Sequence, residues 1–188
     1  SDVCSSDLFV RPKNVNQVLL CFTCDPYQSL DVDLQLTREA IKILHRHDFT
    51  VCILTKGGSR ALRDLDLFTP ADAFATTLTC VDPATSQKWE PGAADPWDRI
   101  HTLRKFYDAG IPTWVSMEPV LDPEMSLELI ERSADYADLF KLGKLNYHPL
   151  AKTIDWRQYL HDATALLDRL GKRYIIKSDL TSYGLEED

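Results

Sequence analysis

Residues 113–134 read TWVSMEPVLDPEMSLELIERSA, and this stretch contains the pattern that decides the fold. The run 113–117 is nearly continuously apolar, which is typical of a strand buried on both faces. Glu118 and Pro119 end the run, and Asp122-Pro123 supplies a helix N-cap with a proline in the first turn. Apolar side chains then recur at helical spacing, at Leu127, Ile130 and Ala134. The stretch therefore predicts a strand, a polar turn and a helix, in that order.

The same order of elements recurs along the chain. Five further apolar runs, rich in branched or aromatic residues, predict strands at 18–22, 51–54, 73–78, 139–142 and 174–176. Segments of helical periodicity lie between them, at 37–47, 60–68, 95–109 and 156–170. Regular β-then-α alternation predicts an α/β fold with parallel strands joined by right-handed crossovers. The spacing alone leaves two architectures open, a section of a TIM-type barrel and a doubly wound sheet.

The chain has 188 residues, a length that is typical of a single domain. Residues 1–8, SDVCSSDL, fit no strand, helix or cap pattern and resemble translated read-through of a sequencing adapter. We therefore expect residues 1–8 to be extraneous and unstructured, and residues 9–188 to form a single partial-barrel domain.

Composition and charge limit which partners and which cellular compartment can be expected. The net charge of −8 gives no support to nucleic acid as a partner, because phosphate neutralisation by a basic face supplies most of that affinity. No apolar run approaches the roughly 18 residues that a membrane span needs, so we expect no membrane contact. Five cysteines in a chain without a secretion signal favour free thiols in the cytoplasm.

Polar side chains follow the predicted strands at the point where each strand ends. These residues are Asp25, Lys56, Thr77, Thr79 and Glu118, with residues 143–148 after the fifth strand. Because the carboxyl ends of parallel strands meet at one edge of a sheet, we expect a common rim that forms the candidate active site. Lysine can hold a carboxylate, threonine hydroxyls can bind ribose, and acids can accept from amino groups. The set suits a zwitterionic, nucleotide-like ligand.

Several of these residues lie in motifs that resemble the spore photoproduct lyase-like (DNA repair photolyase-like) group of radical S-adenosylmethionine (SAM) enzymes. Residues 24–31, CDPYQSLD, followed by residues 36–38, LTR, are similar to the second-strand segment of that group, and residues 53–56, ILTK, to its third-strand motif. Residues 77–79 with Glu90-Pro91 and Arg99 resemble its fourth-strand motif, and residues 110–120 its fifth strand, which ends in a proline. The match covers residues 17 to 121, with weaker support to 147. It implies a partial TIM-type (βα)6 parallel barrel, entered at its second strand, that lacks the first strand and the cluster loop.

The resemblance also implies roles for individual residues. Lys56 would approach the carboxylate of SAM, Thr77 and Thr79 its ribose, and Arg99 a nearby anionic group. Asp25 and Glu90 belong to the same expected cofactor site, and the backbone around residues 117–120, with Glu118 and Pro119, would flank the adenine. In this family a [4Fe-4S] cluster cleaves SAM to a 5′-deoxyadenosyl radical, which abstracts hydrogen from the substrate.

The cysteine motif that holds this cluster, Cys-x3-Cys-x2-Cys, does not occur in the sequence. Cys21 and Cys24 supply two thiols, so no metal site is predicted. The leading hypothesis is therefore a truncated, lyase-like radical SAM enzyme with an unknown substrate, inactive in this form. The residues also allow a barrel hydrolase or Schiff-base aldolase that uses Lys56, or Asp25 and Glu118, directly. A non-catalytic binding remnant is the third alternative.

Overall fold

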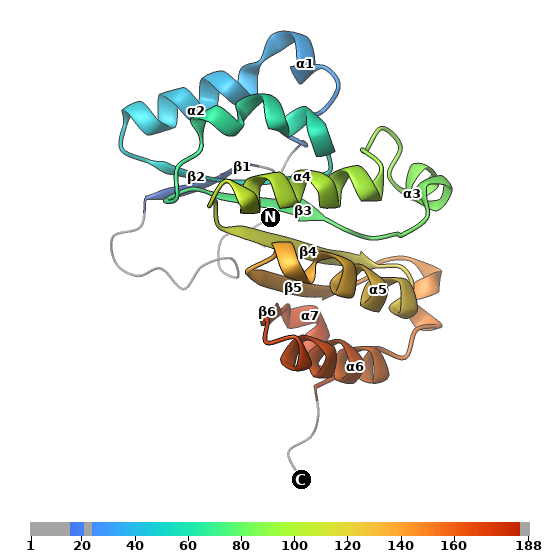
Figure 1. Cartoon of the computed structure of the whole chain (residues 1–188). Helices are drawn as coiled ribbons and strands as arrows, with labels where there is room; N and C mark the ends of the chain where they lie inside the picture. Colours follow the sequence, from blue (N-terminus) through green and yellow to red (C-terminus); the bar gives the residue numbers. More distant parts are fainter. Residues whose placement is uncertain (1–15, 21–23, 185–188) are drawn as a thin grey trace.

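A computed structural model describes residues 16–20 and 24–184 of the chain (Figure 1). Its strands are Gln17–Leu20 (β1), Thr50–Thr55 (β2), Ala73–Thr77 (β3), Thr113–Val120 (β4), Leu139–Lys144 (β5) and Arg173–Ile176 (β6). They form one sheet in the order β1-β2-β3-β4-β5-β6, and every neighbouring pair is parallel. This sequential order is that of a barrel section. It excludes the doubly wound alternative, in which the strand order reverses.

Helical segments connect the strands. The α-helices are Asp31–Leu34 (α1), Leu36–Arg46 (α2), Pro83–Trp89 (α3), Pro96–Asp108 (α4), Pro123–Ser133 (α5), Trp156–Arg169 (α6) and Ser178–Thr181 (α7). The 3-10 segments are Gly58–Leu67 (η1), Ala134–Tyr136 (η2) and Pro149–Lys152 (η3). Within residues 16–20 and 24–184, no helix combines the length and the apolar character that crossing a membrane requires.

The two faces of the sheet are packed differently. On one face, Ile53, Phe74 and Val115 join the main core together with residues of the helices. On the other face, Cys52, Ala75 and Trp114 form a small cluster whose further members all come from strands. Trp114 Nε1 donates a hydrogen bond of 3.3 Å to Cys52 Sγ inside this cluster. One face is thus the helix-covered outside of a barrel section and the other its interior.

Local capping explains where two of the predicted helices begin. The side chain of Asp95 accepts from Trp97 N at 2.8 Å, and that of Asp122 accepts from Met125 N at 2.9 Å. A proline occupies the first turn in both helices, and the one after Asp122 is predicted from the sequence. Gly110 follows α4 with φ +76°, a left-handed conformation that glycine adopts without steric cost.

The structure also corrects several predicted elements. Residues 58–67 form a 3-10 helix rather than an α-helix, and their buried positions, Gly58, Ala61 and Asp64, recur at the three-residue turn of that helix. Strand β4 continues through Glu118 and Pro119 to Val120 instead of ending at residue 117. The predicted first strand extends to residue 22, but residues 21–23 lie outside the described part of the chain. The short elements α1, α3, α7, η2 and η3 are too brief to give a periodic signal.

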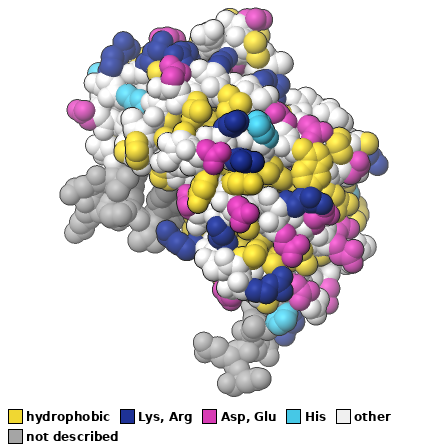
Figure 2. Space-filling model, viewed as in Figure 1, with side chains coloured by type: hydrophobic (Ala, Val, Ile, Leu, Met, Phe, Trp, Pro, Cys, Tyr) yellow, Lys and Arg dark blue, Asp and Glu magenta, His cyan; other side chains and the backbone are white. Residues whose placement is uncertain are grey.

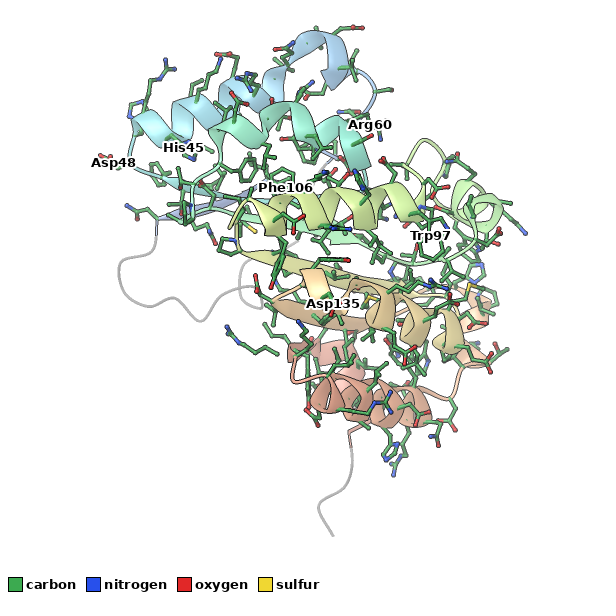
Figure 3. All side chains as sticks on the ribbon, viewed as in Figure 1. His45, Asp48, Arg60, Trp97, Phe106 and Asp135 are labelled. Atoms are coloured by element: carbon green, nitrogen blue, oxygen red, sulfur yellow. The ribbon has the colours of Figure 1, made fainter. Side chains whose placement is uncertain are left out.

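A buried carboxylate ties the amino ends of β2 and β3 together. Asp72 accepts hydrogen bonds from Val51 N at 2.7 Å and from both the backbone N and the hydroxyl of Thr69 at 2.8 Å. His45 Nε2 lies 3.0 Å from the same carboxylate. Burial alone would raise the pKa of Asp72, but these hydrogen bonds outweigh it and hold the pKa below its usual range. Figure 3 shows His45 at this end of the sheet and Arg60 at the opposite end.

Candidate functional site

A hollow of about 390 Å³ opens at the carboxyl ends of the first strands. Three segments line it: Asp25, Gln28 and Ser29 after β1, Lys56 and Arg60 after β2, and the end of α3 with the loop behind it, Trp89, Glu90, Pro91, Gly92 and Ala93. We call it the Lys56 hollow. Its volume falls within the range of small-molecule pockets, about 300–1,000 Å³. Two acids and two bases line the hollow, so it offers partners to both ends of a zwitterion.

Asp25 fixes the backbone from which Lys56 projects. Its carboxylate accepts from the Thr55 hydroxyl at 2.6 Å, from Lys56 N at 2.6 Å and from Tyr27 N at 2.8 Å. A Cβ on Gly57 would lie 2.5 Å from the Cβ of Tyr27, so only glycine allows this approach of the two loops. Asp25 therefore acts in the described structure as the link between the loop after β1 and the end of β2.

The side chain of Lys56 belongs to a chain of charges that runs into the protein. Its Nζ lies 2.8 Å from Glu90 Oε1, and Glu90 Oε2 lies 2.7 Å from a terminal nitrogen of Arg99. The exposed fraction of the side chain falls along this series, from 34% at Lys56 to 7% at Glu90 and 1% at Arg99. Burial alone would raise the pKa of Glu90, but the charges of Arg99 and Lys56 outweigh it and hold the pKa below its usual range.

Arg99 is fully engaged by the protein. Besides Glu90, its guanidinium donates to the carbonyl oxygens of Ala94 at 2.8 Å and Thr77 at 3.0 Å, and to the Ser86 hydroxyl at 3.1 Å. The neighbouring residue, Asp98, accepts from Ser59 N at 2.8 Å at the start of η1. The first turn of α4 thereby holds both loops that flank the Lys56 hollow.

The two threonines of the expected cofactor site lie beside this chain rather than in the hollow. Both side chains are nearly buried, and neither residue lines the hollow. Thr77 contributes its carbonyl oxygen to Arg99, and the hydroxyl of Thr79 lies 3.6 Å from Cys80 Sγ. Contact between these threonines and a ribose remains a prediction.

Glu118 and Pro119 lie in β4, and neither residue lines the Lys56 hollow. Glu118 forms an ion pair with Lys177, which directly follows β6. Between them lies β5, where a Cβ on Gly143 would stand 2.9 Å from the carboxyl carbon of Glu118. The structure thus places all the predicted site residues at the carboxyl end of the sheet, but it brings only Asp25, Lys56 and Glu90 into one hollow, with Arg99 behind them.

Arg60, Gln28 and Ser29 also line the hollow and were not assigned to it from the sequence. Gln28 and Ser29 lie inside the motif that begins at Cys24, three and four residues after Asp25, so that motif was a usable signal. Arg60 gives no such signal, because it reaches the hollow through η1 and a hydrogen bond of 3.2 Å to Gly92 O. Figure 2 shows acidic and basic side chains intermixed on the face in view, without a field of one sign.

A [4Fe-4S] cluster does not fit the described part of the chain. Within residues 16–20 and 24–184, no group of three or more histidine, cysteine, aspartate or glutamate side chains could hold a metal ion. The described cysteines are exposed Cys24 and buried Cys52 and Cys80. Three thiolates for a cluster are therefore not found among these residues.

The fold of the described residues is similar to that of known structures. The six-stranded parallel sheet with alternating helices matches the partial barrel of radical SAM enzymes, so the predicted fold class is confirmed. At 11–15% sequence identity this likeness concerns the fold. No model of a known protein family matches the chain.

Three solved structures illustrate the likeness. A domain of pyruvate-formate lyase-activating enzyme from Bacteroides vulgatus has a TM-score of 0.64 at 15% identity, covering 86% of this chain and 98% of that one. Streptococcus suis SuiB bound to S-adenosylmethionine has a TM-score of 0.65 at 12% identity, covering 92% and 42%. A spore photoproduct lyase mutant with bound S-adenosylmethionine and dinucleoside spore photoproduct has a TM-score of 0.65 at 14% identity, covering 88% and 62%.

One curated relative is similar in sequence. An uncharacterized protein of Methanocaldococcus jannaschii is 24% identical over 157 residues, which are 82% of this chain and 59% of that protein. The chain thus spans less than two thirds of the length of this relative.

Proposed function

We propose that this chain is the SAM-binding part of a radical SAM enzyme, and that SAM occupies the Lys56 hollow. The observation that carries the proposal is the pair of opposite charges, Lys56 and Glu90, 2.8 Å apart on the wall of one hollow. The amino-acid end of SAM carries an ammonium and a carboxylate on one carbon atom. A fixed pair of opposite charges is complementary to both groups.

The remaining lining suits the nucleoside end. Trp89 offers an aromatic face on which a planar base can stack, and Gln28 and Ser29 offer hydrogen-bonding side chains to hydroxyl groups. Arg99 has a different role in this proposal. Because it is buried and committed to Glu90, it positions that carboxylate and does not touch the ligand.

Radical chemistry requires a cluster for which the described residues offer no three thiolates. In the proposal, those ligands come from outside residues 16–20 and 24–184, and the substrate is not specified. The contribution of the described residues is to bind and orient SAM and to restrict the access of water to it.

The proposal is tested by calorimetric titration of the chain with SAM and with adenosine, which lacks the amino-acid end. We expect SAM to bind at least about tenfold more tightly than adenosine, because each charge-assisted hydrogen bond is worth about 1.5–3 kcal/mol. Lys56→Gln should remove about tenfold of this preference and leave adenosine affinity unchanged.

Lys105→Gln is the matched control, since this exposed lysine of α4 lies away from the hollow. Equal affinities for SAM and adenosine would contradict the assigned orientation. A folded chain that binds neither molecule would refute the proposal itself.

A further inference from the structure

A second hollow, of about 350 Å³, lies after β5. One continuous segment lines it, with the residues Lys144, Leu145, Asn146, Tyr147, His148, Pro149, Ala151 and Lys152. We call it the β5 hollow. The predicted rim already contained most of this segment, but the Lys56 hollow uses none of its residues.

The charge of the β5 hollow differs from that of the Lys56 hollow. Among the described residues that line it are two lysines and a histidine, and none is acidic. This basic lining stands out in a chain with a net charge of −8. A lining with two lysines and no carboxylate favours an anion, whereas the mixed lining of the Lys56 hollow favours a zwitterion.

Two of the polar side chains of the β5 hollow are held in place by the protein. Lys144 Nζ donates to the hydroxyl of Tyr183 at 3.1 Å and lies over the ring of the same residue. Asn146 Nδ2 donates to the carboxylate of Asp179 at 2.6 Å. Such fixed groups lose little freedom when a ligand binds.

Tyr147 presents an aromatic ring beside these groups. Its side chain is fully exposed, although a tyrosine is large and apolar enough to gain from burial. Its backbone has φ +58°, a left-handed conformation that costs a non-glycine residue about 1 kcal/mol or more. Exposure and strain together are unfavourable for the folded chain alone, and a planar ligand stacked on the ring would offset them.

The Lys56 hollow and the β5 hollow are adjacent to each other. Trp89, which lines the Lys56 hollow, makes an edge-to-face contact with His148 of the β5 hollow, with the ring centroids 4.9 Å apart. Ligands in the two hollows would therefore be separated by the Trp89–His148 ring pair.

We infer that the β5 hollow binds a planar anion, a ring that carries a carboxylate or a phosphate, as the second ligand of the mouth. The ring stacks on Tyr147, and the acid group meets Lys152 and His148. As the place of the enzyme's substrate, this site rests on the proposed function. As a binding site it stands on the geometry of residues 144–152 alone.

The test uses two fluorescent probes of matched shape, the anion 2-aminobenzoate and the neutral 2-aminobenzamide, titrated into the full chain. We expect 2-aminobenzoate to bind about tenfold more tightly, and inorganic phosphate to displace it. Lys152→Ala should weaken 2-aminobenzoate about threefold to fivefold. Lys105→Ala, which removes the same charge from α4, should have no effect.

Tyr147→Gly separates binding from folding. The glycine relieves the left-handed backbone, so the urea midpoint should stay equal or rise, while 2-aminobenzoate affinity falls about fivefold. Equal affinity for the two probes, equal effects of Lys152→Ala and Lys105→Ala, or loss of the probe on Lys56→Gln would each overturn the inference. SAM titration is a separate measurement, so failure of SAM binding with intact probe binding would sink the proposed function and leave the β5 hollow standing.

Discussion

The two ends of the sheet each contain a nearly buried carboxylate, and the comparison between them separates structure from function. Asp72, at the amino end, is surrounded by N–H and O–H donors and by His45. Glu90, at the carboxyl end, is held between the cations Lys56 and Arg99. In both residues the pKa lies below its usual range in spite of burial.

The difference lies in what the partners face. The partners of Asp72 join β2 and α2 to the turn that precedes β3, so its low pKa reports a structural link. One partner of Glu90, Lys56, lines a hollow and is partly exposed. A lowered carboxylate pKa therefore indicates a functional site only where a partner can also reach a ligand.

The largest effect is expected from Arg99→Met, which removes the buried end of the charge chain. Glu90 would keep only Lys56, and the carbonyl oxygens of Ala94 and Thr77 would lose their donor. Because breaking a buried ion pair leaves an uncompensated charge, we expect a loss of about 3–5 kcal/mol in the free energy of unfolding. Urea denaturation measures it. A loss no larger than that of Arg104→Met, an exposed arginine of the same helix, would contradict the structural role of Arg99.

A smaller loss is expected at the other end from Asp72→Asn. The carbonyl oxygen of the new asparagine can still accept hydrogen bonds on one side. Its NH2 group must then face another donor, either Val51 N or Thr69 N. We expect a loss of about 1–3 kcal/mol in unfolding free energy, with SAM binding unchanged. Asp108→Asn, an exposed carboxylate of α4, is the matched control and should stay within about 0.5 kcal/mol. A change in SAM affinity on Asp72→Asn would contradict the purely structural role of Asp72.

The smallest effect is the dependence of stability on pH. A carboxylate whose pKa is lowered in the folded state adds stability above its unfolded pKa, and this stability is lost as pH falls through the folded pKa. Unfolding free energy should therefore decrease from about pH 5 downward, around and below the ordinary carboxyl pKa of about 4. Glu90→Gln and Asp72→Asn should each flatten the decrease. Urea midpoints across this pH range measure the decrease. An unchanged dependence of the midpoint on pH in both variants would show that the acid sensitivity comes from groups other than Glu90 and Asp72.

Features that depend on neighbours in sequence were predictable. The strand–helix alternation and the cap at Asp122 follow from local patterns, and the structure confirms them. Because parallel strands deliver their ends to one edge, the common rim of polar residues was predictable as well.

Features that depend on tertiary packing were not. The sequence marks Lys56, Glu90 and Arg99 separately, but it gives no sign that the loop after α3 returns to place Glu90 between the two cations. Likewise, the three-residue turn of η1 differs from an α-helical turn by only about 0.6 residue, too small a difference to read in a ten-residue segment. The separation of the mouth into a mixed-charge and a basic hollow also follows from how the loops fold back.

The first turn of α4 has a consequence for how this mouth can vary. Asp98 and Arg99 are adjacent, and one holds the start of η1 while the other holds the segment that contains Glu90. A single insertion or deletion between Asp95 and Asp98 would rotate both side chains by about 100° relative to the helix start and release both walls of the Lys56 hollow together. The dimensions of the Lys56 hollow thus depend on one helical turn.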